Sequence, residues 1–153
     1  HAIKELKKLD LIDELKYKIQ KYSIPVLGIC LGMQILSSTG SEVKLEQGLD
    51  FIPGKVEILN KMPDKLPHLG WNSVNFNRED KLFDGIENNK DFYFIHSYYF
   101  SCENKKNILA TTKYNQLFPS IVKENLIYGM QFHPEKSLKN GLKILNNFLK
   151  INE

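Results

Sequence analysis

The sequence predicts a single α/β domain, from three observations. Its 153 residues fit one domain, which would bury roughly 70% of the surface that the unfolded chain exposes. The apolar run at residues 24–29 is typical of a strand buried on both faces, and residues 137–152 have the spacing of an amphipathic helix. Several β-prone segments lie between them without a repeat or a linker, so we expect one domain over residues 1–153.

The elements can be assigned in chain order. A first helix is expected over residues 1–22, where apolar side chains recur every three or four positions: Ile3, Leu6, Leu9, Ile12, Leu15 and Ile19. The strand at 24–29 then leads directly into a helix at 31–38. The remaining elements are strand-like pieces within 48–59, a loop at 60–73, a short helix at 81–86, strands within 91–102, 108–115 and 118–132, and the final helix at 137–152.

Composition excludes several classes of protein. The net charge of +3 comes from scattered lysines, which indicate a solvated surface and no nucleic-acid partner. No apolar run reaches the roughly 18 residues of a membrane span, and no signal peptide opens the chain. The two cysteines have no metal-ligand spacing, so we expect no metal, two free thiols and a cytoplasmic location.

The stretch Gly28-Ile-Cys30-Leu-Gly32 has the form of a strand-turn-helix elbow that presents a nucleophile. Such a turn is strained and tightly packed, so we expect side chains at Gly28 and Gly32 to collide with neighbours. The N-terminus of the following helix should lower the pKa of Cys30 and favour the thiolate. The alternative is a buried structural cysteine beside incidental glycines.

A base for this nucleophile is predicted at His133, directly after a strand-like segment. Glu135 follows two residues later, and in extended chain this spacing places both side chains on one side. Nucleophile, base and orienting carboxylate together indicate a catalytic triad, built where strands of an open sheet end. Taken alone, His133 could be a turn histidine before proline.

The segments GICLGMQ and GMQFHPEKS resemble the class I (triad) glutamine amidotransferases. The chain also resembles one branch of this family, the HisH glutaminase subunits of imidazole glycerol phosphate synthase. This resemblance lies in the segments HAIKELKKLDLIDEL, GLDFIPGKV, PHLGWN, FYFIHSYY and NGLKILNNFL. The resemblance implies a flavodoxin-like layered fold with a mostly parallel central sheet and no cofactor. It also implies hydrolysis of L-glutamine to glutamate and ammonia, with ammonia passed to a cyclase that makes imidazole glycerol phosphate and AICAR for histidine.

The resemblance implies a role for each matching residue. Cys30 would form a thioester, with His133 as acid and base, Glu135 as its orienter and the N–H of Leu31 as an oxyanion donor. Substrate glutamine would be bound by Gln34, by Glu42 and by the backbone around His96, Ser97 and Tyr98. Without the resemblance, Gln34 and Glu42 read as exposed surface residues, and the His96 side chain reads as a packing residue outside the triad.

The resemblance further implies a heterodimer with a HisF-like (β/α)8-barrel cyclase. Trp71, Asn72, Tyr93 and Lys136 match positions at that interface, although core packing of Trp71 is the alternative. Other readings are a HisH-like subunit for another acceptor such as a surface-sugar precursor, a catalytically weak docking subunit, and a γ-glutamyl peptide hydrolase.

The resemblance also implies roughly 50 residues upstream of His1, with the first strands of the sheet and a loop that supplies a second oxyanion N–H. On this reading the domain is N-terminally incomplete. Because the loss of one oxyanion donor costs about a hundredfold to a thousandfold in rate, we expect little glutaminase activity from the 153 residues alone.

Overall fold

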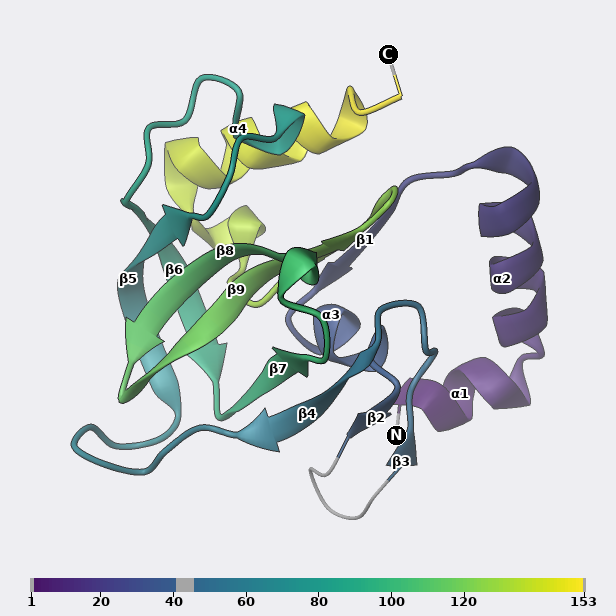
Figure 1. Ribbon diagram of the computed structural model, residues 1–153, viewed down its shortest axis with the longest axis horizontal. Coiled ribbons are helices and arrows are strands. Elements are labelled where there is room, and N and C mark those ends of the chain that lie inside the picture. Colours follow the sequence, from purple (N-terminus) through teal and green to yellow (C-terminus); the bar gives the residue numbers. More distant parts are fainter. Residues whose placement is uncertain (1, 41–45, 153) are drawn as a thin grey trace.

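The computed structural model describes residues 2–40 and 46–152, and Figure 1 shows how their helices and strands are arranged. The first elements are α1 (Ala2–Lys8), α2 (Leu11–Tyr22), β1 (Val26–Ile29), α3 (Leu31–Ile35), β2 (Thr39–Gly40), β3 (Glu46–Gln47) and β4 (Gly54–Ile58). They are followed by β5 (His68–Phe76), the 3-10 turn η1 (Lys81–Phe83), β6 (Lys90–His96), β7 (Tyr98–Cys102), η2 (Lys105–Asn107), β8 (Ile108–Tyr114), β9 (Gln116–Glu124), β10 (Ile127–Met130), η3 (Pro134–Lys136) and α4 (Leu138–Leu149).

The helix expected over residues 1–22 is two helices. Asp10 lies between them in the left-handed region, with a φ of 52°, which a short polar residue tolerates better than most others. The chain therefore changes direction here, and Leu9, whose spacing grouped it with the apolar face, is 62% exposed. The amphipathic prediction holds on either side of the break, where Ile3 is buried and Ile12 packs against a hydrophobic cluster.

The strands form a six-stranded sheet in the order β1-β10-β9-β8-β5-β6 and a four-stranded sheet in the order β3-β2-β4-β7. Among the described strands, the parallel pairs are β1 with β10 and β2 with β4, and the other pairs are antiparallel. The prediction of a mostly parallel sheet is therefore wrong for these strands. Tight turns at Asn115 and Asn125, both with positive φ, join β8, β9 and β10, and strands joined this way have to be antiparallel.

The segment expected as a loop over residues 60–73 becomes strand from His68 onward. There β5 pairs with β6 in antiparallel register, from His68 opposite His96 to Val74 opposite Lys90. The local sequence contains proline and glycine and does not predict a strand here. The strand forms because β6 provides the backbone hydrogen-bond partners. Trp71 therefore lies on a strand, opposite Tyr93, and not on a loop.

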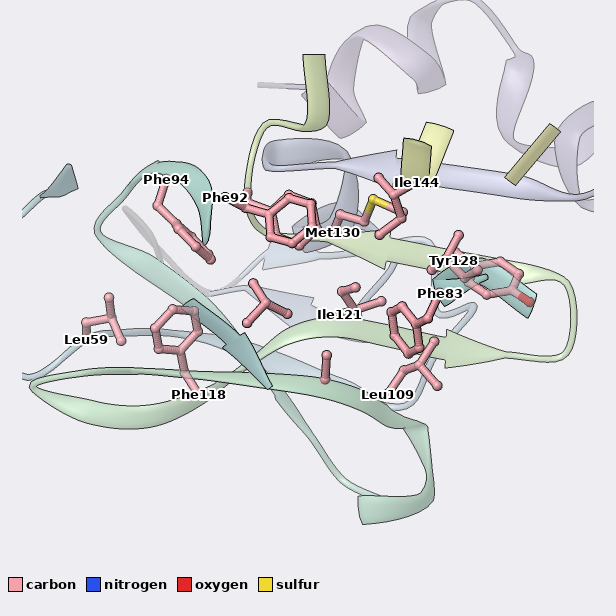
Figure 2. Packing of buried hydrophobic residues seen from close by; sticks show 14 residues of the cluster. Leu59, Phe83, Phe92, Phe94, Leu109, Phe118, Ile121, Tyr128, Met130 and Ile144 are labelled. Atoms are coloured by element: carbon pink, nitrogen blue, oxygen red, sulfur yellow. The ribbon is translucent and has the colours of Figure 1, made fainter. Parts of the chain in front are cut away.

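The larger hydrophobic core lies between the six-stranded sheet and α4, which packs against η1, η3 and β6. Figure 2 shows Phe92, Phe94, Phe118, Ile121 and Met130 within this cluster, together with Ile144 of α4. A second cluster combines apolar side chains of α1 and α2, such as Ile3 and Ile12, with others such as Met33 of α3. Figure 1 shows α1 and α2 together on one side of the molecule. The two clusters therefore cover opposite faces of the sheet at the β1 and β10 pair.

The parallel pairing of β1 with β10 positions the candidate site. Ile29, the last residue of β1, lies opposite Met130, the last residue of β10. Cys30 and the segment that begins at Gln131 therefore leave the sheet at the same edge. This is the edge at which neighbouring parallel strands place their functional side chains.

Candidate active site

Cys30 occupies the predicted elbow between β1 and α3. Its φ of 50° and ψ of −105° lie in a region that non-glycine residues rarely adopt. The conformation is held on both sides, because the Cys30 N–H donates to Met130 O across 2.7 Å and the Cys30 carbonyl accepts from the N–H of Gln34 across 3.2 Å. The strand, strained turn and helix therefore follow one another as the motif predicts.

The two glycines of the elbow have different surroundings. A Cβ at Gly28 would lie 2.4 Å from the carbonyl oxygen of Gly32, so a side chain there would force β1 away from α3. A Cβ at Gly32 would have nothing within 4 Å. The expected collision is therefore correct for Gly28 and wrong for Gly32, which faces open space.

His133 and Glu135 are in direct contact. Nδ1 of His133 lies 2.7 Å from Oε1 of Glu135, which accepts the ring proton and leaves Nε2 of His133 as the basic nitrogen. The backbone of His133 is also fixed, because its N–H donates to Tyr93 O across 2.8 Å and its carbonyl accepts from the Ser137 hydroxyl across 2.7 Å. The predicted base and orienter thus form a hydrogen-bonded pair on a rigid backbone.

The environment of Cys30 raises the pKa of its thiol, mainly because the sulfur is desolvated by burial. The N–H of Leu31 and the amide of Gln131 act in the opposite direction, and the charge of Glu135 raises the pKa further. The expectation of a lowered pKa is therefore wrong in direction. A helix of five residues offers little dipole, and burial outweighs it.

Gln34, which the resemblance assigned to glutamine binding, lies against residues from two other segments. Its Nε2 donates to Tyr98 O across 3.0 Å and to Oε1 of Gln131 across 3.2 Å. Nε2 of Gln131 in turn lies 3.7 Å from the sulfur of Cys30. Sequence reasoning missed Gln131, although its position directly after β10, the parallel neighbour of β1, could have indicated it.

The segment 96–98, which the resemblance assigned to the glutamine pocket, contacts Gln34. Tyr98 accepts from Gln34 through its carbonyl, and the Ser97 carbonyl accepts from the N–H of Leu59 across 2.9 Å. Glu42, the other residue assigned to the glutamine head group, lies outside the described residues.

The side chain of His96 belongs to a buried hydrogen-bond chain. The Asn72 amide N–H donates to Lys113 O, so the same NH2 group donates to Nε2 of His68 across 3.1 Å. Nδ1 of His68 then donates to Nε2 of His96 across 3.0 Å, and Nδ1 of His96 donates to Tyr98 O across 2.8 Å. Both histidines are neutral in this chain, and burial lowers the pKa of each to about 4. The expectation that His96 is a packing residue outside the triad agrees with this geometry.

An exposed apolar surface covers the outer side of β5 and β6. We call it the β5–β6 patch, and it consists of the exposed Leu69, Trp71 and Ile95 and the half-buried Tyr93. Trp71 is 49% exposed and packs edge-on against Tyr93, with the ring centroids 5.9 Å apart. Nζ of Lys136 lies over the ring of Tyr93, 6.0 Å from its centroid. The carbonyl of Ile95 lies 3.8 Å from the sulfur of Cys30, so the patch adjoins the site.

Three of the four expected interface residues therefore lie together. Trp71 and Lys136 both contact the ring of Tyr93, whereas Asn72 directs its amide inward to His68. Within residues 2–40 and 46–152, no three His, Cys, Asp or Glu side chains are grouped to hold a metal ion. In the same part of the chain, no helix has both the length and the apolar character needed to cross a membrane.

Comparisons with known proteins agree with this arrangement. The sequence model of the family "Glutamine amidotransferase class-I" matches residues 7–151. A relative named imidazole glycerol phosphate synthase subunit HisH 2 from Methanococcus maripaludis is 50% identical over 148 residues, which cover 95% of this chain and 72% of the relative. HisH subunits from Vibrio vulnificus and Methanocaldococcus jannaschii are each 46% identical, over 97% and 92% of this chain and 69% and 70% of their own lengths.

Solved structures show the same fold at lower identity. A crystal structure of a putative GMP synthase protein from Thermoplasma acidophilum gives a TM-score of 0.65 at 23% identity, and covers 95% of this chain and 65% of that one. A glutamine amidotransferase crystal structure gives a TM-score of 0.68 at 16% identity, over 97% of this chain and 71% of that one.

Proposed function

Since the chain belongs to the class I glutamine amidotransferases, and among them to the HisH subunits of imidazole glycerol phosphate synthase, we propose that Cys30, His133 and Glu135 hydrolyse L-glutamine. The observation that carries the proposal is the hydrogen-bonded His133–Glu135 pair at the same sheet edge as Cys30, which the register of β1 and β10 brings about. We assign residues 1–153 to one glutamine amidotransferase domain.

The geometry suggests how protons move during the reaction. Because burial keeps the Cys30 thiol protonated, Nε2 of His133 must take that proton as the sulfur attacks the carboxamide carbon of glutamine. The imidazolium, stabilised by Glu135, then protonates the departing nitrogen, which leaves as ammonia. A γ-glutamyl thioester remains, and His133 activates the water that releases glutamate and restores the thiol. The N–H of Leu31, the residue after the nucleophile, would stabilise the oxyanion.

Gln34 is proposed to hold the amino-acid end of glutamine. Both hydrogens of its amide are used by Tyr98 O and Gln131 Oε1, so Oε1 of Gln34 is the atom that can accept from the substrate ammonium group. Glu42 would add a carboxylate, and the backbone of Ser97 and Tyr98 would line the same pocket.

The β5–β6 patch with Lys136 is proposed as the docking surface for a HisF-like barrel cyclase in a heterodimer. An apolar centre with an aromatic anchor and a flanking charge is the composition of a binding hot spot. The patch lies next to the sulfur of Cys30, so ammonia would be released beside the partner that converts it into imidazole glycerol phosphate and AICAR for histidine synthesis.

Glutamate release by the full-length protein, with the cyclase present, tests the catalytic proposal. Cys30→Ser and His133→Asn should each lower kcat by more than a thousandfold, because the triad acts as a unit. Cys102→Ser is the matched control and should leave the rate within a factor of about two. Turnover by Cys30→Ser at the unsubstituted rate would exclude Cys30 as the nucleophile.

Affinity for the cyclase tests the docking surface. Trp71→Ala should weaken binding at least tenfold, as the loss of a buried aromatic anchor does. Leu117→Ala is the control, because Leu117 is 66% exposed on β9, outside the β5–β6 patch. Equal affinities for the two variants would place the partner on another face.

A further inference from the structure

We propose that Gln131 is a further catalytic residue, whose amide N–H donates to the sulfur of Cys30 when the sulfur becomes the nucleophile. The inference rests on the proposed glutaminase function and adds a residue to it. Gln131 is fully buried, and its Nε2 lies 3.7 Å from Sγ of Cys30. At this distance an N–H group donates a hydrogen bond to sulfur. A hydrogen bond to a charged group is about twice as strong as a hydrogen bond between neutral groups.

The orientation of the Gln131 amide is fixed by its neighbours. Tyr98 O is a carbonyl oxygen and can only accept, so the group of Gln34 that faces it must be the NH2. That NH2 can only donate, so the atom of Gln131 facing it must be Oε1. The other end of the Gln131 amide, its NH2 group, therefore faces the sulfur.

The contacts of the sulfur change with its protonation state. As a thiol, Cys30 can donate to the carbonyl of Ile95, which lies 3.8 Å away. As a thiolate it has no proton to donate, and the donors directed at it are the amide of Gln131 and the N–H of Leu31. These two groups favour the reactive form, and Gln131 is the one that comes from a side chain.

The surrounding charges make such a donor necessary. The carboxylate of Glu135 disfavours a negative sulfur, and β1 and α3 contribute no titratable side chain other than Cys30 at their junction. On β6, His96 follows Ile95, whose carbonyl lies near the sulfur, and His96 is neutral in its hydrogen-bond chain with His68. His133 and Lys136 are the other titratable groups on the segment after β10. The groups that lower the pKa of Cys30 against burial are two neutral donors, the N–H of Leu31 and the amide of Gln131.

A purely structural role for Gln131 is the competing explanation. Its amide links α3, through Gln34, to the end of β10, so its removal could simply loosen the site. That role predicts a lower melting temperature and a higher KM, because Gln34 would move. It does not predict a change in the acidity of Cys30.

The two explanations separate in a single-thiol background. In the full-length protein carrying Cys102→Ser, the rate of alkylation by iodoacetamide is measured against pH, which gives the midpoint for ionisation of Cys30. Gln131→Met removes the donor at similar side-chain length, and Gln131→Glu replaces it with a negative charge. Gln116→Met is the matched control, because Gln116 bonds to the N–H of Asn60 on another part of the molecule.

We expect the midpoint to rise in Gln131→Met and to rise further in Gln131→Glu, while Gln116→Met leaves it unchanged. With glutamine and the cyclase, kcat should fall about tenfold to a hundredfold in Gln131→Met, the cost of one hydrogen bond to a charged group, with a smaller change in KM. A folded Gln131→Met protein with the original midpoint would overturn the proposal, whatever its KM. Absence of glutamine hydrolysis in the unsubstituted protein would instead overturn the proposed function, because the alkylation midpoint needs no turnover.

Discussion

The backbone N–H of His133 donates to the carbonyl oxygen of Tyr93 across 2.8 Å. The segment that carries the proposed base is thus bonded to the strand that carries the β5–β6 patch. Ser137 reinforces this link, because its hydroxyl accepts from the N–H of Tyr93 across 2.9 Å and donates to the carbonyl of His133 across 2.7 Å. The imidazole therefore has a fixed position relative to the exposed surface.

Ser137→Ala should lower both stability and glutaminase rate. The substitution leaves the N–H of Tyr93 without its partner in a buried place, which costs about 1–3 kcal/mol in the free energy of unfolding. The carbonyl of His133 still accepts from the N–H of Lys136. Ser120→Ala is a matched control, since the buried hydroxyl of Ser120 has no hydrogen-bond partner among the described residues. Urea unfolding measures both variants, and equal losses would contradict the role given to Ser137.

Gly28→Ala should disrupt the elbow, whereas Gly32→Ala should not. The new methyl group at position 28 would lie 2.4 Å from a backbone oxygen, and overpacking of this kind costs about 1–3 kcal/mol or more. Position 32 has open space around it. Melting temperature and the alkylation rate of Cys30 report the outcome, and a Gly32→Ala protein as impaired as Gly28→Ala would show that the packing is described wrongly.

The buried histidine pair should make the protein sensitive to mild acid. His68 and His96 have a pKa of about 4 in the folded chain, against about 6.5 when unfolded. Between these pH values the unfolded chain binds more protons than the folded chain. The contribution of the two neutral histidines to the free energy of unfolding is therefore fully present above pH 6.5 and is lost as pH decreases toward 4. The slope approaches about 1.4 kcal/mol per pH unit for each histidine.

Urea unfolding at pH 7.5 and pH 5 checks this dependence. His96→Gln should be less stable than the unsubstituted protein at pH 7.5, because it interrupts the hydrogen-bond chain. It should nevertheless lose less stability between the two pH values, since one titrating group is gone. Parallel losses in the two proteins would show that the pair is not responsible.

The two thiols should differ in reactivity. Burial raises the pKa of Cys102 to about 12, so about one molecule in a thousand carries the thiolate there at pH 9. Cys30 is also raised, but two donors oppose the shift. Mass spectrometry after brief iodoacetamide treatment at pH 9 should find Cys30 modified at least tenfold faster, and a faster Cys102 would contradict the assignment.

The local sequence predicts the parts of the site that depend on neighbouring residues. The elbow at Cys30 follows from an apolar strand, a tight turn and a helix in immediate succession. The His133–Glu135 contact was predicted from a spacing of two residues in extended chain. The contact is present, but the chain there forms the 3-10 turn η3 and is not extended. Both predictions needed only short-range geometry.

Properties that depend on distant segments were missed or predicted wrongly. The sheet is mostly antiparallel because tight turns at Asn115 and Asn125 join its strands, and the sequence around Trp71 forms a strand because β6 pairs with it. The free surroundings of Gly32 and the raised pKa of Cys30 likewise depend on which atoms fill the space around them.

The sequence by itself determined the family, the strand-turn-helix elbow at Cys30 and the contact between His133 and Glu135. Those features depend on residues that are close together in the sequence, because a turn needs particular residue types at fixed positions relative to one another. Tertiary structure alone decided that Gln131 faces the sulfur of Cys30, from 101 positions away. It also decided that Tyr93 holds His133, because hydrogen bonds between strands depend on register and not on distance along the chain.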